Sequence, residues 1–392
     1  IPTIHTSRPP CKPMPRLSSL SLVVLITALA NDGRALDHVS FQRDGRPHHV
    51  SGKVLVEAQD GGVLLQDPAG VLWAVTADEL EKREQDQVPF QPLDKGALKE
   101  HLLREMPAGF RIHTTVHYVI CYNTSEAYAR WCGALFERLF LAFRTFWRER
   151  DFDFQDPDTP LAALVFNSKR SYANYAREEL GDATSAITGY YSLRTNRVTM
   201  YDLTGADTLR NLGRMSSTKH INRLLSQPQA ERTVATVIHE ATHQLAFNCG
   251  FQTRYSDIPL WLSEGIAVYF ETPDLRSKRG WRNIGGVNRV RLAGFGRYLR
   301  TRPDDSLRTL IANDDRFRPT ASAPGAYAEA WALNYFLIRT RLKSYVSYLK
   351  DLSEKKPLLY DQPDERIQQF EARFGDLGEL DVAFLRYMRG IR

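Results

Sequence analysis

Long hydrophobic runs, blocks of one charge and internal repeats are scarce or absent in this sequence. Apart from residues 20–30, no apolar segment approaches the ~20 residues that a membrane-spanning helix needs. Lysine and arginine are scattered, so the net charge of +6 forms no basic cluster, and no nucleic-acid-binding motif occurs. We therefore expect no nucleic-acid partner, and we attribute the net positive charge to solubility or to contact with anionic surfaces.

Cysteine is also scarce, with four residues in the chain. No two of them have the spacing of metal ligands. Cys11 would be removed with a signal peptide, which leaves the odd number Cys121, Cys132 and Cys249. Cys121 and Cys132 could form a disulfide after export, or Cys132 could belong to the core, because it lies on an apolar helix face.

The N-terminal segment has the features of a secretory signal peptide. From Met14 onward, Arg16 gives a positive start, residues 20–30 are apolar, and Ala28-Leu29-Ala30 fits the small-residue pattern of a cleavage site. The alternative is an uncleaved N-terminal anchor helix. We expect a secreted, periplasmic or cell-envelope protein that keeps no stable membrane span after the signal is cleaved.

The rest of the chain has an ordinary soluble composition, with 43% hydrophobic and 25% charged residues. Residues 50–76 contain short apolar strands separated by Asp-Gly-Gly and Asp-Pro-Ala-Gly turns, which predict a small antiparallel β unit of SH3-like type. A charged stretch and a proline-containing linker follow, so we place a domain boundary near residue 90. The predicted segments are 1–35, extra N-terminal residues plus the signal peptide, then 36–90, the small β domain, and 91–392, the main domain.

Within the main domain, strands and helices are mixed first, and the pattern is helical after residue 284. The expected elements are a strand at 110–121, a long helix at 124–149, a buried strand at 161–167 and two strands within 186–202. Asn123 with Glu126 in capping-box spacing would open the long helix. His113 and His117 would share one face of the first strand. No acid accompanies them in the sequence, so a solvated or edge face is a better interpretation than a second metal site.

Histidine is scarce as well, yet two of the ten histidines lie four residues apart in VIHEATHQLAFNCGF, residues 237–251. Four helical residues advance about 400°, so His239 and His243 project from one face, while Glu240 points about 100° away. This is the H-E-x-x-H arrangement, in which two imidazoles hold a metal ion and the glutamate lies over a water. The alternative is an amphipathic helix with solvent-facing histidines. The surrounding helix is mostly apolar, however, and burial without partners would be costly.

The third metal ligand should be a carboxylate. No histidine follows His243, which excludes the pattern with a third histidine downstream. Glu264 lies in an apolar helix whose start is predicted at Asp257 and Pro259. Gly265 weakens that helix, which needs a reason such as the close approach of another backbone. We predict Glu264 as the third ligand, with a surface acid as the alternative.

These motifs resemble the gluzincins, the zinc peptidases grouped as peptidase MA. HEATH followed by the glutamate of WLSEGIAVYFE carries the resemblance, and W-L-x-E-G-x-A is similar to the aminopeptidase-N-type branch. Residues 110–390 resemble a family of exported bacterial proteins with a peptidase-MA-like domain of unknown function. The resemblance implies an α+β fold over 91–392, namely a zincin-like metallopeptidase domain with a mixed sheet, an HExxH helix and a helical C-terminal subdomain. It also implies a zinc ion and hydrolysis of peptide bonds.

Two departures from the family pattern affect the expected activity. The Gly-x-Met-Glu-Asn segment of the aminopeptidases is absent, so no identified anion would hold a free α-amino group, and we expect internal cleavage. The thermolysin branch has an aspartate where this chain has Val268, which leaves Glu271 as the nearest candidate to support a ligand histidine.

The expected site therefore combines three zinc ligands with two catalytic residues. The ligands are His239, His243 and Glu264, and Glu240 is the general base. Tyr327 follows Glu264 at about the interval at which aminopeptidase-type gluzincins place a catalytic tyrosine. Packing of Tyr327 on Trp331 is the alternative for that residue, and Tyr335 is its rival for the catalytic role.

The expected partner is a peptide or protein substrate, added as an extra strand beside the strands within 186–202. An alternative of a different class is a catalytically inactive zincin-fold binding or scaffold protein at the cell envelope. Glu240 favours the enzyme, because a structural metal site does not need a base there.

Overall fold

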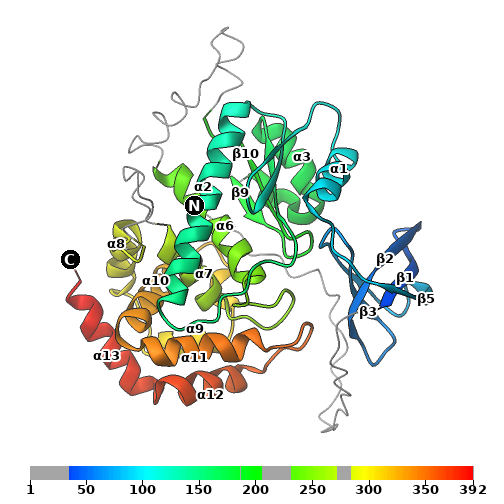
Figure 1. Ribbon diagram of the computed structural model, residues 1–392. Helices are drawn as coiled ribbons and strands as arrows, with labels where there is room; N and C mark the ends of the chain where they lie inside the picture. Colours follow the sequence, from blue (N-terminus) through cyan, green and yellow to red (C-terminus); the bar gives the residue numbers. More distant parts are fainter. Residues whose placement is uncertain (1–34, 186, 205–230, 272–283, 392) are drawn as a thin grey trace.

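The computed structural model describes residues 35–185, 187–204, 231–271 and 284–391. Within these ranges the chain forms an N-terminal antiparallel sheet, a mixed sheet flanked by helices, and a helical C-terminal region (Figure 1). This is the α+β architecture expected from the sequence. The expected signal peptide and Cys11 lie outside the described residues.

The first sheet contains five antiparallel strands in the order β4-β3-β2-β1-β5. The strands are β1 (Ala35–Arg43), β2 (Arg46–Glu57), β3 (Val63–Gln66), β4 (Leu72–Val75) and β5 (Leu80–Pro89). Asp44 and Gly45 join β1 to β2 with φ of 52° and 70°, as a tight hairpin turn requires. Val39 and Phe41 of β1 belong to a small apolar core on one face of this sheet.

The second sheet also has five strands, in the order β6-β7-β8-β10-β9. The elements are α1 (Lys95–Glu105), β6 (Arg111–Thr114), β7 (Tyr118–Tyr122), α2 (Glu126–Arg148), β8 (Leu161–Phe166), α3 (Lys169–Leu180), η1 (Gly181–Ser185), β9 (Gly189–Tyr191) and β10 (Arg197–Tyr201). Strands β7, β8 and β10 are parallel, whereas β6 and β9 are antiparallel edge strands. Helix α2 packs on one face of the sheet, and α1 with α3 packs on the other (Figure 1).

The prediction of one continuous strand over 110–121 is wrong, because a turn at 115–117 divides this segment into β6 and β7. Glu137 of α2 stabilises the turn. Its carboxylate accepts hydrogen bonds from the Thr115 hydroxyl at 2.6 Å and the His117 backbone N–H at 2.7 Å. His117 Nδ1 lies 2.6 Å from the same carboxylate, so an acid does accompany this histidine. In the part of the chain that the structure describes, His113 and His117 join no group of three metal-ligating side chains.

The N-cap of α2 is also different from the prediction. The Ser125 hydroxyl, not Asn123, caps the helix and accepts a hydrogen bond from the Tyr128 N–H at 3.2 Å. Asn123 instead accepts a hydrogen bond from the Asn167 N–H at 2.7 Å, and this bond joins the loops that follow β7 and β8. Sequence spacing alone does not distinguish the two caps, because Asn and Ser are both favoured at this position.

The three described cysteines are buried and carry free thiols. Cys121 of β7 points into the core beneath α1 and α3, whereas Cys132 of α2 belongs to the core on the opposite face of the sheet. The alternative of a disulfide between them is therefore wrong, and the core interpretation of Cys132 is confirmed.

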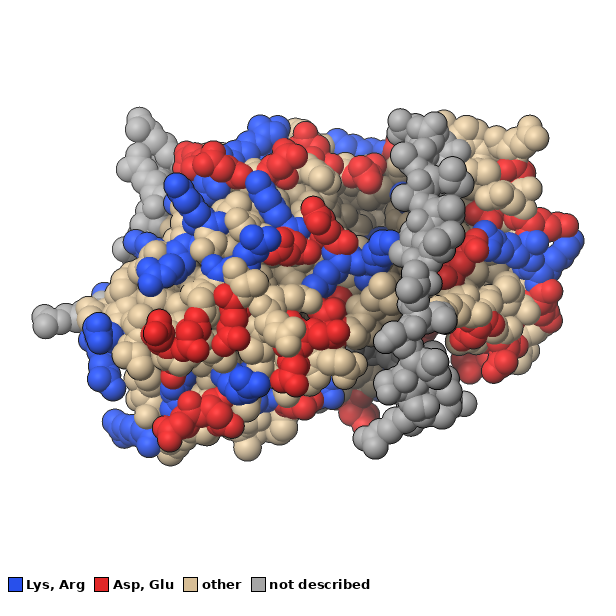
Figure 2. Space-filling model, turned by 90° about the horizontal axis from the view of Figure 1, so that it is seen from below, with Lys and Arg blue, Asp and Glu red and all other residues tan. Residues whose placement is uncertain are grey.

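The remaining described elements are all helical, and this confirms the helical pattern predicted after residue 284. They are α6 (Glu231–Asn248), α7 (Leu260–Phe270), α8 (Arg289–Tyr298), α9 (Ser306–Ala312), η3 (Asp315–Phe317), α10 (Ala323–Thr340), α11 (Leu342–Ser353), α12 (Pro363–Phe374) and α13 (Leu377–Arg389). None of these or the other described helices combines the length and apolar character that a membrane crossing needs. On the face shown in Figure 2, basic and acidic side chains are interspersed, in line with the scattered charges of the sequence.

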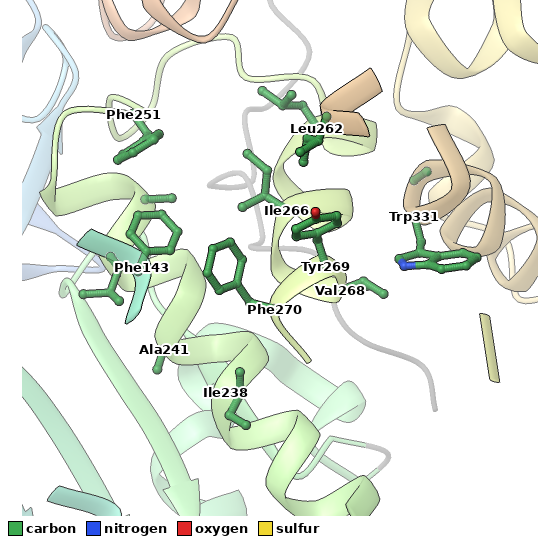
Figure 3. Close-up of a cluster of buried hydrophobic side chains, with 14 of the residues drawn as sticks. Phe143, Ile238, Ala241, Phe251, Leu262, Ile266, Val268, Tyr269, Phe270 and Trp331 are labelled. Carbon is green, nitrogen blue, oxygen red and sulfur yellow. The ribbon is translucent and has the colours of Figure 1, made fainter. Parts of the chain in front are cut away.

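Helix α7 is the centre of the main hydrophobic core. Nearly all of its side chains are buried, and Figure 3 shows Ile266 and Phe270 among side chains from α2, α6 and α10. An apolar environment on all sides explains why a mostly apolar helix forms here. It also means that any polar group on α6 or α7 facing this interior needs a partner.

The first sheet is attached to the main domain next to strand β9. The partly buried Arg254 guanidinium donates to the backbone carbonyls of Gly70, Leu193 and Arg194, at 2.8, 3.1 and 3.4 Å. The Leu72 N–H also donates to the Arg194 carbonyl at 2.7 Å. Strand β5 ends at Pro89 and α1 begins at Lys95, on either side of the boundary expected near residue 90.

Candidate metal centre

Three buried side chains from α6 and α7 converge on one point. His239 Nε2 lies 3.1 Å from His243 Nε2 and 3.1 Å from Glu264 Oε2, and His243 Nε2 lies 3.6 Å from Glu264 Oε1. One ligand atom from each residue falls within 4.8 Å of the others. All three residues are at most 3% exposed. The two histidines thus share one helix face as predicted, and Glu264 is the buried acid that joins them.

The other ring nitrogen of each histidine is engaged by the protein. His239 Nδ1 lies 2.8 Å from Glu271 Oε1, and His243 Nδ1 lies 3.3 Å from the Ser263 hydroxyl. These contacts direct both Nε2 atoms toward Glu264. Metal-bound histidines commonly use their second nitrogen in this way. The residues present therefore fit a metal ion held by two imidazoles and one carboxylate.

Gly265 explains how α7 brings Glu264 into position. A Cβ on this residue would lie 1.8 Å from Asn334 Nδ2 and 2.9 Å from the Ala330 carbonyl oxygen, both on α10. The close backbone approach that the sequence suggested is therefore confirmed. Asn334 also donates to the Trp261 carbonyl at 2.9 Å, which ties α10 to α7 one turn before Glu264.

The start of α7 differs from the prediction. Pro259 is the N-cap, and the Leu260 N–H donates to Asp314 Oδ1 at 3.0 Å. Asp257 lies before the helix and forms a buried ion pair with Arg366, with 2.8 Å between Arg366 Nε and Asp257 Oδ2. Asp257 therefore pairs with Arg366, more than 100 residues away in the chain, and does not cap the helix. Helix α6 ends at Asn248, and Gly250 follows with a φ of 86°, the left-handed conformation that is common just after a helix.

The pKa shifts of the ligand group place a proton on His239 and a negative charge on Glu264. Burial lowers the pKa of His239, but hydrogen bonds to Glu264 and Glu271 outweigh burial and raise this pKa to about 10. Burial opposes ionisation of Glu264, yet the two histidines hold its pKa well below the ordinary value. Because a ligand histidine must be neutral, metal binding here would release a proton from His239.

Glu240 lies beside the ligand group without belonging to it. The residue is 6% exposed, and its Oε2 accepts a hydrogen bond from the Tyr191 backbone N–H at 2.9 Å. Burial raises the pKa of Glu240 above its ordinary value. Tyr191 is in β9, at the edge of the second sheet, so this contact brings the sheet edge next to the candidate centre.

Tyr327 is buried in α10, near the N-terminus of that helix. Its ring packs edge-on against Phe317 with 5.2 Å between ring centroids, and the Arg291 guanidinium carbon lies 5.5 Å from the Tyr327 ring centroid. Its catalytic role remains a prediction. Tyr335 is also buried and packs on Trp331 with 5.5 Å between ring centroids, as a core residue does.

Sequence reasoning missed several groups that surround the ligands. These are the Tyr191 N–H, Ser263 and Gln252 near His243, and Asn288 and Arg291 near Glu271. Only Ser263 had a local signal, because it directly precedes the predicted ligand Glu264. The others come from a strand, a loop and a helix whose proximity depends on the tertiary fold.

The fold and site thus define an α+β protein with a buried two-histidine, one-glutamate group that could hold a metal ion. Residues 233–359 match the family model described as "Protein of unknown function (DUF1570)". The matched segment contains all three members of the ligand group as well as Glu240 and Tyr327. A comparison with curated proteins finds no match to the chain.

Proposed function

We propose that this chain is an exported zinc-dependent peptidase. Two histidines and one glutamate form the donor set of catalytic zinc sites that leave a fourth position for water or substrate. The buried His239, His243 and Glu264 group supports this proposal, with the two Nδ1 atoms engaged elsewhere and both Nε2 atoms directed inward.

The position of Glu240 beside the ligand group is the observation that most directly supports catalysis. A structural metal site has no use for a further buried acid beside its ligands, yet Glu240 lies next to them and is held by the Tyr191 N–H at 2.9 Å. Zinc, when bound, polarises a substrate carbonyl and lowers the pKa of a water toward neutrality. Glu240 would accept the proton of the attacking water and transfer it to the leaving amine. Its raised pKa brings it closer to the operating pH of such a base.

Strand β9 is the proposed binding edge for an extended peptide. The Ser192 N–H donates to the Arg197 carbonyl at 3.0 Å, which sets the hydrogen-bonding phase of the β9–β10 pair. The backbone groups of Tyr191 and Gly189 therefore point away from β10. The Tyr191 N–H reaches Glu240, and the proposed role of the Gly189 backbone is to pair with substrate as an added strand.

Tyr327 is the proposed second donor to the carbonyl oxygen that becomes negative as water adds. Its place in the apolar start of α10 supports this role, because a hydroxyl in a water-poor site stabilises developing charge strongly. The proposal of export has separate support in Arg16 and the apolar residues 20–30.

The direct test uses the purified chain and a library of peptides, half of them N-acetylated. We expect cleavage that disappears when zinc is removed by a chelator and returns when zinc is added back. We expect internal cleavage sites and equal use of acetylated peptides, because no anion for a free amino terminus has been identified. Zinc binding without cleavage of any library would instead favour the inactive binding or scaffold protein.

A further inference from the structure

The first turn of α8 contacts the acid that supports His239. Asn288 Nδ2 lies 3.3 Å from Glu271 Oε2, and Arg291 Nη2 lies 3.7 Å from Glu271 Oε1. Asn288 is also the N-cap of α8, since its Oδ1 accepts a hydrogen bond from the Arg291 N–H at 3.1 Å. One amide side chain therefore joins the start of α8 to Glu271.

Glu271 is in a position where it needs such support. It is the residue that follows the last helical residue of α7, Phe270, so the helix itself restrains this side chain little. Its Oε1 lies 2.8 Å from His239 Nδ1, and its side chain is 11% exposed. The contacts of Asn288 with Oε2 and of Arg291 with Oε1 therefore affect whether the carboxylate stays aligned with the imidazole.

Arg291 is restrained in turn by α10. Its guanidinium lies over the Tyr327 ring at 5.5 Å, and its side chain is 20% exposed. An arginine held over an aromatic face keeps its planar group in a fixed orientation better than a lysine would. The carboxylate of Glu271 thus meets an amide and a guanidinium that are both fixed by the start of α8.

We propose that Asn288 and Arg291 are positioning residues for the metal centre. They hold Glu271 and, through Glu271, set the orientation of the His239 ring. This inference rests on the proposed binding of zinc. Partners of this kind typically change metal affinity by about 10- to 100-fold when they are removed.

The test measures zinc affinity by competition with a chelator, using substitutions that keep the net charge. Asn288→Ser keeps a good N-cap residue but is too short to reach Glu271. Arg291→Lys keeps the charge and removes the planar group. We expect Asn288→Ser to weaken zinc binding about tenfold, with a smaller loss for Arg291→Lys. The matched control is Arg289→Lys, at an exposed position of the same helix, which should bind zinc like the unmodified chain.

Repeating both substitutions in a Glu271→Ala variant distinguishes an effect on the position of Glu271 from a general loss of stability. In Glu271→Ala, neither Asn288→Ser nor Arg291→Lys should weaken zinc binding further, because both act through Glu271. The visible absorption of the Co²⁺-loaded chain should change in Asn288→Ser and not in Arg289→Lys, since it reports ligand geometry. Unchanged zinc affinity in Asn288→Ser, or the same fold loss in both backgrounds, overturns the inference while zinc binding stands. A chain that binds no zinc at all overturns the proposed function and this inference together.

Discussion

The backbone N–H of Tyr191 donates a hydrogen bond to the side chain of Glu240 across 2.9 Å. The two residues are far apart in the chain, and their contact joins an edge strand to the helix that carries both histidines. The same helix is fixed to the neighbouring turn by Gln244, whose Nε2 donates to the Asn196 carbonyl at 2.8 Å. These hydrogen bonds fix the position of Glu240, the candidate base, relative to β9, the strand proposed to bind substrate.

Metal content is the first property to measure. The protein should contain about one zinc per chain, since one group of two histidines and one glutamate is available. Replacing both histidines, in His239→Ala/His243→Ala, should abolish this content in elemental analysis of protein purified in metal-free buffer. Full zinc occupancy in that double variant would disprove the ligand assignment.

Gly265→Ala should destabilise the protein by about 3 kcal/mol, because the added methyl would collide with α10. The collision involves the Ala330 carbonyl oxygen at 2.9 Å and Asn334, which is itself hydrogen-bonded to Trp261 and Ala330. Neither neighbour can move away without breaking a contact. Chemical denaturation gives the free energy of unfolding.

The matched control for this prediction is Gly296→Ala. Gly296 lies in the second half of α8, and a Cβ there would meet nothing within 4 Å. Alanine should therefore stabilise this helix by about 0.5–1 kcal/mol relative to glycine. Equal effects at the two glycines would show that α7 and α10 do not pack as closely as described.

The sequence predicts the elements that carry the ligands well, because their signals are local. The helix period places His239 and His243 on one face, and the apolar surroundings of Glu264 mark it as a buried acid that needs a partner. Gly265 likewise reports the close approach of α10. For each of these residues, the relevant information lies within one or two turns of the same helix.

The incorrect predictions involve residues whose partners are distant. Asp257 resembles a helix cap until Arg366 is brought to it, and the segment around His117 resembles a continuous strand until Glu137 fixes a turn there. The contact between Asn288 and Glu271 could not be predicted for the same reason, since nothing in the segment around Asn288 indicates it. Sequence periodicity defines which face a residue occupies and does not define what lies opposite that face.

Tyr327→Phe should lower kcat by about a hundredfold or more, because it removes one donor to the developing oxyanion. Zinc content and melting temperature should stay nearly unchanged, since the ring and its packing on Phe317 remain. Tyr335→Phe is the control, because Tyr335 packs in the core with Trp331. Equal rates for the Tyr327 and Tyr335 variants would remove Tyr327 from the proposed mechanism.

The most direct test of the account is the zinc content and peptide cleavage rate of Glu240→Gln. The amide keeps the size of the carboxylate and still accepts the Tyr191 N–H, but it cannot take a proton from water. We predict zinc content equal to that of the unmodified chain and loss of nearly all cleavage. A variant that retains zinc and cleaves the library at the full rate would contradict the central claim that Glu240 is the general base of a metallopeptidase.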